Sequence, residues 1–216
     1  FFKSILSIRE TFWMNCKTFI NFLWNKMIDD AKIIVLDHGS GSVKVGFAGN
    51  NAPTSIFPSI VGRPQFVAAM VNDKCKDSYI GDESIENSPF LLQKYPVEHG
   101  IVRNWDDVEK IWEYAFKNKL KVESSEHPVL QTEAPMNPKA NREKMIQLMF
   151  ETFNIPSFYV GIQGILSLYA SGQTTGLICE IGDGVTQVIP VFRSKYVTNA
   201  IFRDNFGGYD HTEWLQ

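Results

Sequence analysis

Apolar positions along this chain follow two patterns, short extended runs and longer segments with helical spacing. Residues 33–36 are apolar without interruption, a glycine-rich turn follows at 39–41, and a second run completes a hairpin over about 33–49. The same order of strand, glycine turn and strand returns at 176–190. Further strands are predicted at 65–74, 79–83 and 128–133.

Three segments have the apolar spacing of amphipathic helices. The first follows Asn104 as its N-cap, with acidic residues in its first turns and lysines near its end, the order that the helix dipole favours. Asn137 is the predicted cap of a second helix that ends near residue 152. A third is expected over about 160–170, with Gly172 ending it. Strands and helices together predict an α/β fold.

The composition is that of an ordinary globular protein and excludes several classes. The chain has 216 residues, 44% of them hydrophobic and 21% charged, with a net charge of −3. A nucleic-acid-binding surface is therefore not expected, because the basic excess that phosphates require is missing. Cys16, Cys75 and Cys179 form no C-x-x-C pair, which argues against a zinc site or a disulfide framework and fits a reducing cytosol. No apolar run reaches the length of a membrane span.

Residues 1–26 differ in character from the rest of the chain. Phe, Ile, Asn and Lys are over-represented, the chain begins with Phe, and charges interrupt any signal-peptide core. Two interpretations remain: an amphipathic helix that binds a membrane surface or a partner, and an extension outside the native domain. We favour the extension, poorly ordered or loosely helical over 1–30.

The opening hairpin carries the groups that a polyphosphate site needs. Gly39 and Gly41 allow a sharp turn that points several N–H groups into one concavity. Ser40 adds a hydroxyl, Lys44 a positive charge, and Asp37 a carboxylate for a hydrated cation. The alternative is a plain hairpin with a Gly-Ser-Gly turn, and this stretch alone does not separate the two.

The second hairpin repeats these features in register. An acid, any residue, Gly, a small polar residue and Gly occur in both, and the offset is 143 residues from 37 to 180 and from 39 to 182. Glu180 thus corresponds to Asp37. Two such turns on facing domains would grip a phosphate chain, with both acids flanking Mg²⁺ or Ca²⁺. The repeat therefore favours a cleft ATPase.

The last residues begin an element without completing it. Asp210 is the predicted N-cap of a helix, and the chain ends about one and a half turns later. A duplicated fold whose second half has just begun is most simply a fragment. We expect this fragment to be inactive and to bind ATP weakly or not at all.

Several longer runs resemble the actin family, and the resemblance covers residues 31–216. They include the two glycine turns and the stretches at 45–49, 57–64, 76–83, 94–102, 104–107, 132–135, 137–145 and 166–172. The resemblance implies an α/β, actin-like (ribonuclease H-like) duplicated ATPase fold, present as the first half plus the start of the second domain. It further implies ATP or ADP, held with Mg²⁺ or Ca²⁺, in a cleft between the two domains.

Individual site residues are implied by matching the family's motifs. Gly39, Ser40, Gly41 and Lys44 match the first phosphate loop. A second set matches the other phosphate loop: Gly182, Asp183, Gly184 and Val185. The remaining matches are Asp37 and Glu180 at the metal, Gln163 at the glutamine that positions the attacking water, Gln187 near that water, and His99 at a histidine that is methylated in many actins.

The implied activity of the full-length protein is a weak, assembly-coupled ATP hydrolysis in a filament of the cytoplasmic cytoskeleton. The implied partners are other actin subunits and actin-binding proteins, with no nucleic acid and no membrane span. Residues 63–76 cover the loop that engages the next subunit. Its segment 65–74 is either a half-buried strand or an apolar loop that inserts into a partner.

Departures from the family pattern keep a second function open. Glu180 replaces Asp, Ile181 replaces Ser, Gln187 replaces His and His38 replaces Asn, and the subunit-contact loop diverges. These changes favour, as the alternative, an actin-related protein that acts as a nucleotide-binding scaffold in a multi-subunit complex. A small-molecule kinase with the same duplicated fold is a third possibility, and the long family-specific runs argue against it.

The expected domains follow from the hairpins. Residues 1–30 are the extension, and 31–170 form the first domain, with a small inserted subdomain at about 59–95. Residues 171–216 are the truncated start of the second domain.

Overall fold

The computed structural model describes residues 32–65 and 76–215 of the chain. The expected extension over 1–30 and nearly all of the segment 65–74 lie outside these residues. Within the described ranges, no helix is long and apolar enough to cross a membrane.

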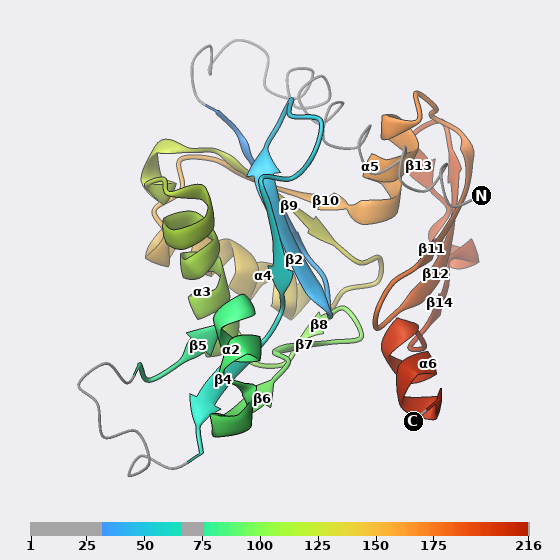
Figure 1. Cartoon of the computed structure of the whole chain (residues 1–216). Helices are drawn as coiled ribbons and strands as arrows, with labels where there is room; N and C mark the ends of the chain where they lie inside the picture. Colours follow the sequence, from blue (N-terminus) through green and yellow to red (C-terminus); the bar gives the residue numbers. More distant parts are fainter. Residues whose placement is uncertain (1–31, 66–75, 216) are drawn as a thin grey trace.

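A five-stranded mixed sheet forms the centre of the larger part (Figure 1). Its strand order is β10-β9-β1-β2-β3, with β1, β9 and β10 parallel and β1, β2 and β3 antiparallel to their neighbours. The strand bounds are β1 Ile34–His38, β2 Ser42–Phe47, β3 Ser55–Pro58, β9 Val129–Glu133 and β10 Phe158–Ile162. The predicted α/β class and the opening hairpin are confirmed.

Two helices cover one face of this sheet and bury the main core. They are α3 Trp105–Tyr114 and α4 Lys139–Gln147, and each continues in wider turns, over Ala115–Leu120 and Leu148–Thr152. Alternate residues of β1 and β2 pack against the apolar stripe of α3, with Trp112 fully buried at its centre. The predicted cap of α3 is confirmed, because the Asn104 side chain accepts from the Asp107 N–H at 3.1 Å.

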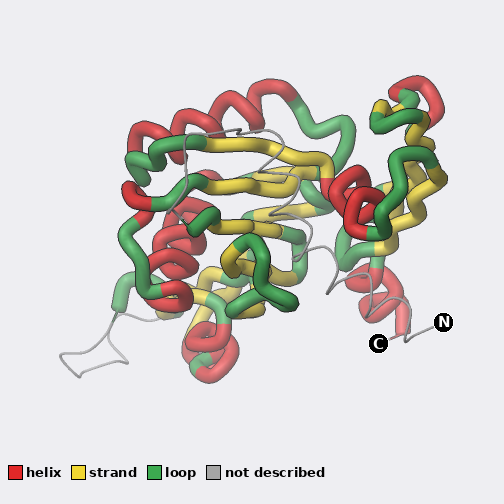
Figure 2. Tube along the Cα trace, turned by 90° about the horizontal axis from the view of Figure 1, so that it is seen from above, coloured by secondary structure: helices red, strands yellow, loops and turns green. Residues whose placement is uncertain are grey.

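A second sheet lies beside the first and belongs to the C-terminal part of the chain (Figures 1 and 2). It comprises β11 Gly176–Ile181, β12 Thr186–Phe192, β13 Lys195–Tyr196 and β14 Phe202–Asp204. Helix α5, Gln163–Ala170, connects it to β10, and α6, Gly208–Leu215, follows β14. Leu168 of α5 packs on Ile178, Ile189 and Val191, which gives this part a small core of its own.

Two small sheets lie between β3 and β9 in sequence. Strands β5 Tyr79–Ile80, β4 Val61–Pro64 and β6 Leu91–Lys94 form a three-stranded sheet with the short helix α2, Asp82–Glu86. Strands β7 Val97–Glu98 and β8 Ile101–Val102 form a hairpin. Short 3₁₀ turns occupy Ser88–Phe90, Ser124–Glu126 and Thr198–Ala200.

Several predicted element boundaries are wrong. The segment 160–162 is strand and not helix, because Val160 pairs with Gln131 in the central sheet. Asn137 does not cap α4, whose N-cap is Pro138, and its amide instead donates to Glu133 at 3.2 Å. Only the first two residues of 79–83 are strand.

The predicted cap of the last helix is also wrong. Helix α6 begins at Gly208, two residues before Asp210. The Asp210 carboxylate lies in the first turn and accepts from the Gly207 N–H at 2.7 Å, which is the returning arm of a capping box.

Candidate functional site

The first glycine turn joins β1 to β2 and is closed by its own backbone. The Gly39 N–H donates to the Ser42 carbonyl at 3.0 Å. Asp37 and Lys44 are register partners across the two strands, and their side chains form an ion pair of 2.9 Å. The hairpin therefore places one acid and one cation together at the base of the turn.

Asp37 receives a second partner from the neighbouring parallel strand. The hydroxyl of Thr132, on β9, donates to the other carboxylate oxygen of Asp37 at 2.5 Å. Asp37 is 7% exposed, so this bond and the ion pair with Lys44 compensate its lost hydration. The sequence predicted the strand that carries Thr132 but not its pairing with β1, and the contact was therefore missed.

The opposite side of the first turn is anchored in the main core. The Trp112 indole N–H can only donate, so the Nδ1 atom of His38, 3.0 Å away, is the acceptor. The Nε2–H of His38 then donates to the Ser59 hydroxyl at 2.9 Å, and the Ser59 N–H donates to the Gly41 carbonyl at 3.1 Å. Burial lowers the pKa of His38 from 6.5 to about 4, although Asp37 acts to raise it. A neutral imidazole thus links the first turn to Trp112 of the main core and to Ser59.

The second turn, between β11 and β12, repeats this construction. The Gly182 N–H donates to the Val185 carbonyl at 2.8 Å, and Glu180 pairs with Gln187 in the strand register. These positions follow Gly39, Ser42, Asp37 and Lys44 at the 143-residue offset that relates 37 to 180. The repeat seen in the sequence is therefore present in the backbone hydrogen bonds and in the strand register.

Neutral partners hold the second acid. The Gln187 amide donates to one oxygen of Glu180 at 2.6 Å, and the Ser167 hydroxyl donates to the other at 3.2 Å. Burial raises the pKa of Glu180, and the charge of Asp37 acts in the same direction. Ser167 lies on α5, and no pattern in the sequence pointed to it.

The two turns meet directly. A Cβ on Gly41 would lie 2.6 Å from the Asp183 carboxylate, and one on Gly184 would lie 2.9 Å from the Ser40 hydroxyl. Only glycine leaves room for a side chain of the other turn at these distances. The four predicted glycines and the side chains of Ser40 and Asp183 are thus gathered at one point, which we call the cradle (residues 39–41 and 182–184).

The β7–β8 hairpin bridges the cradle (Figure 1). The His99 Nδ1–H donates to the Gly184 carbonyl at 2.8 Å, and the Gly100 N–H donates to the Ser40 hydroxyl at 2.8 Å. The Arg203 guanidinium donates to the His99 carbonyl at 2.7 Å and holds this tip in place. The family match gave His99 only as a possible methylation site, and its contact with the second turn was not predicted.

The two predicted catalytic glutamines have different surroundings. Gln163 is the first residue of α5, and its carbonyl accepts from the Ser167 hydroxyl at 3.1 Å. Gln187 is 4% exposed, and its Oε1 atom has no hydrogen-bond partner among the described residues. An orphaned buried acceptor at this position is suited to a donor that a ligand or water would bring.

The oxygen chemistry of the cradle fits a phosphate chain with a hard cation. Asp37 and Glu180 are near enough for their charges to interact, and the hydroxyls of Thr132 and Ser167 donate to them. No cluster of three or more His, Cys, Asp or Glu side chains occurs in the described part of the chain. Such a pair suits a cation that keeps several of its waters, as Mg²⁺ does.

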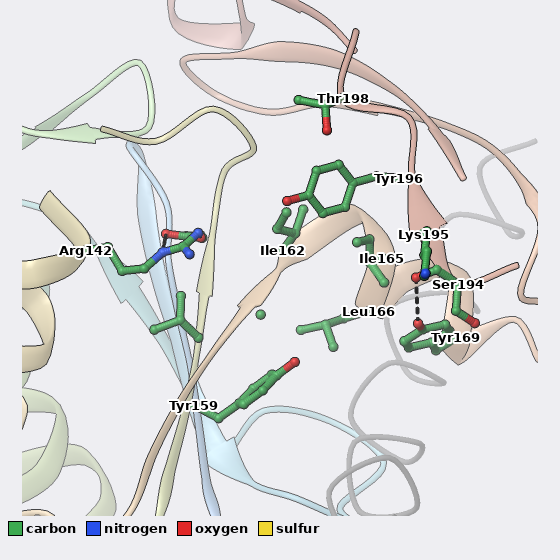
Figure 3. Close-up of a pocket in the computed structure, with 13 residues that line it drawn as sticks. Arg142, Tyr159, Ile162, Ile165, Leu166, Tyr169, Ser194, Lys195, Tyr196 and Thr198 are labelled. Atoms are coloured by element: carbon green, nitrogen blue, oxygen red, sulfur yellow. Dashed lines mark hydrogen bonds and ion pairs between the residues drawn. The ribbon is translucent and has the colours of Figure 1, made fainter. Parts of the chain in front are cut away.

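A cavity of about 570 Å³ adjoins the cradle. Its lining includes Ser40, Asp183 and Gly184 of the cradle, together with Tyr95 and Tyr209. A second cavity, of about 460 Å³, lies between the β10–α5 segment and the turn after β12 (Figure 3). Tyr159, Tyr169 and Tyr196 line it, and it contains none of the predicted site residues.

Comparison with known proteins supports the resemblance seen in the sequence. The sequence model of the family described as Actin matches residues 28–216. An "Actin-like protein" of Neurospora crassa is 49% identical over 184 residues, which are 85% of this chain and 48% of that protein. The chain thus spans about half the length of the curated relative that it matches.

Proposed function

The chain belongs to the actin family, and we propose that its two glycine turns bind the phosphates of ATP or ADP with Mg²⁺ or Ca²⁺. The observation that carries the proposal is the cradle itself. There, two equivalent hairpins from opposite halves of the chain are in contact, with a glycine of each turn against a side chain of the other. A hairpin is stable without a second copy in register and without contact to it, so hairpin stability alone does not explain this arrangement.

The chain's own residues divide the work of binding. The N–H groups of 40, 41, 183 and 184 would donate to phosphate oxygens, and the Ser40 hydroxyl would add a donor. Lys44 would neutralise part of the phosphate charge, and Asp37 and Glu180 would hold the cation through their carboxylate oxygens, directly or through its waters. The cation supplies positive charge to the phosphates when it is bound.

Hydrolysis, in this proposal, depends on positioning an attacking water in line with the terminal phosphate. Gln163 orients this water from the start of α5. Gln187 assists through its free amide oxygen, because its amide N–H is already committed to Glu180. Since Gln187 is not a base at neutral pH, the proposed hydrolysis is slow. Its coupling to assembly is proposed from membership of the actin family.

The whole protein is proposed to polymerise into filaments in the cytoplasmic cytoskeleton, with other actin subunits and actin-binding proteins as partners. The alternative is a nucleotide-binding scaffold in a multi-subunit complex. Gln187 favours this alternative, because its amide donates to Glu180 and supplies neither a positive charge nor a base to the reaction.

Nucleotide binding is tested by titrating the full-length protein with ATP in the presence of Mg²⁺. Lys44→Ala removes the cation beside Asp37 and should raise the dissociation constant by about tenfold or more. Lys139→Ala is the matched control, because that side chain is 90% exposed and lies on α4. Equal affinities for the two variants would refute the cradle as the phosphate site.

Assembly is tested separately by sedimentation of the same protein with Mg-ATP and salt. A pellet that grows with protein concentration supports filaments. Recovery of the protein as one member of a complex of fixed composition, with no pellet, supports the scaffold.

A further inference from the structure

Two exposed tyrosines from opposite halves of the chain face each other across the cavity beside the cradle. Tyr95 follows β6, and Tyr209 lies in the first turn of α6. Their ring centroids are 6.4 Å apart with an angle of 59° between the planes, which is within the range of favourable aromatic pairs. Both line the cavity of about 570 Å³ that Ser40 and Asp183 also line.

Tyr209 is fixed to the second turn through the backbone. Its N–H donates to the Asp183 carbonyl at 2.9 Å, and the preceding Gly208 N–H donates to the Gly182 carbonyl at 3.0 Å. A Cβ at Gly207 would lie 2.3 Å from the Asp183 carbonyl oxygen, so glycine is required for α6 to start this close to the turn. The Tyr209 ring must therefore move with the second turn.

Tyr95 is linked to the first turn by the β7–β8 hairpin. The residue after it, Pro96, accepts from the Arg103 N–H at 2.8 Å, which closes the base of the hairpin. At the tip of the hairpin, the Gly100 N–H donates to the Ser40 hydroxyl at 2.8 Å. A displacement of the first turn is thus transmitted to Tyr95 through one short hairpin.

We propose that Tyr95 and Tyr209 form an aromatic latch that holds the two turns together across this cavity and slows the release of a nucleotide bound between them. The effect on nucleotide release rests on the proposed function. The rings are 44% and 51% exposed, so neither is needed to fill a core. Their mutual contact is an aromatic one that crosses between the halves, beside the hydrogen bonds from His99 to Gly184 and from Arg203 to His99. Burial and the charge of Asp183 raise the pKa of Tyr95, so its hydroxyl stays neutral beside that carboxylate.

The first test needs no nucleotide. Hydrogen exchange of the Gly208 and Tyr209 amides reports whether α6 stays bonded to the second turn. In the full-length protein, Tyr95→Ala should speed this exchange by about 2- to 10-fold, the range that one aromatic pair contributes. Tyr95→Phe should leave it unchanged, because the ring is kept. Unchanged exchange in Tyr95→Ala would overturn the latch.

The second test measures release of a fluorescent ATP analogue when excess ATP is added. Tyr95→Ala and Tyr209→Ala should each speed release by about 2- to 10-fold, and the double variant should be no faster than either, because one contact is lost in all three. Tyr196→Ala is the control, since that tyrosine lines the other cavity and is 40% exposed. Additive effects, or effects equal to the control, would overturn the role in release.

The two tests separate the latch from the proposed function. Suppose that Tyr95→Ala speeds amide exchange but the unaltered protein does not bind the analogue. The latch between the halves would then be supported, and its role in nucleotide release would be refuted. Binding of the analogue with unchanged amide exchange would support the proposed function and overturn the latch.

Discussion

The buried imidazole under the first turn predicts a specific dependence of stability on pH. His38 accepts from Trp112 and donates to Ser59, so both ring nitrogens are committed in the neutral form. Protonation would break the bond from Trp112 and place a cation in a poorly hydrated site near Lys44. The folded state therefore resists protonation, whereas the unfolded chain does not.

The size of the effect follows from the two pKa values. The pKa falls from 6.5 in the unfolded chain to about 4 in the folded one. Between these values the unfolded state binds more protons, so the free energy of unfolding falls as the pH falls. The contribution is fully present above pH 6.5 and is lost by pH 4, and about 2 kcal/mol of it is lost between pH 7 and 4.5.

Urea unfolding of the 216-residue chain and of His38→Asn at pH 7 and pH 4.5 measures this contribution. The free-energy gap between the two proteins should shrink by about 2 kcal/mol at the lower pH, because the variant has no group that titrates there. Other titrating groups, Glu180 among them, are common to both proteins and cancel. His211→Asn, at an exposed histidine, should run parallel to the unaltered chain. A constant gap for His38→Asn would refute the assignment of a neutral, buried imidazole.

Three further outcomes are expected. Gln131→Leu should raise the free energy of unfolding by about 1 kcal/mol in urea titrations, because Gln131 is 2% exposed and its Oε1 atom has no partner among the described residues. Glu180→Gln should stabilise the ligand-free chain at neutral pH, because burial makes the charged carboxylate costly in the folded state and raises its pKa. The gain should disappear below pH 4.5, where the carboxyl is protonated in both the folded and the unfolded chain. Gly41→Ala should destabilise the chain by about 1 to 2 kcal/mol, and Asp183→Gly in the same chain should recover part of the loss, which a double-mutant cycle in urea measures.

The parts of the site that could be predicted from the sequence are those encoded within one hairpin. An apolar run, a pair of glycines and a second run specify a turn locally, and the acid and its cross-strand partner follow from the same register. The second occurrence made the pattern specific, because two turns at one offset are far less common than one.

The missed contacts all come from segments distant in the sequence. Thr132 reaches Asp37 through the parallel pairing of β9 with β1, and Ser59 reaches His38 from beyond β3. A local pattern does not state which strands become neighbours, so these partners could not be assigned. The segment 160–162 was misassigned for the same reason, since a short apolar run fits a helix and a buried strand equally well.

The two halves of the cradle differ in charge although they share a backbone. Asp37 has a cation, a hydroxyl donor and a core-anchored turn, whereas Glu180 has an amide and a hydroxyl and a raised pKa. The position equivalent to Lys44 in the second turn is Gln187, so Glu180 has no ion-pair partner like the one that Lys44 gives Asp37. Under the proposed function, phosphate binding should therefore depend mainly on the first turn. Under the same proposal, hydrolysis should depend on the second turn, where the amides of Gln163 and Gln187 would have to orient the water. Substitutions at Glu180 and Gln187 should therefore distinguish the filament from the scaffold better than substitutions in the first turn.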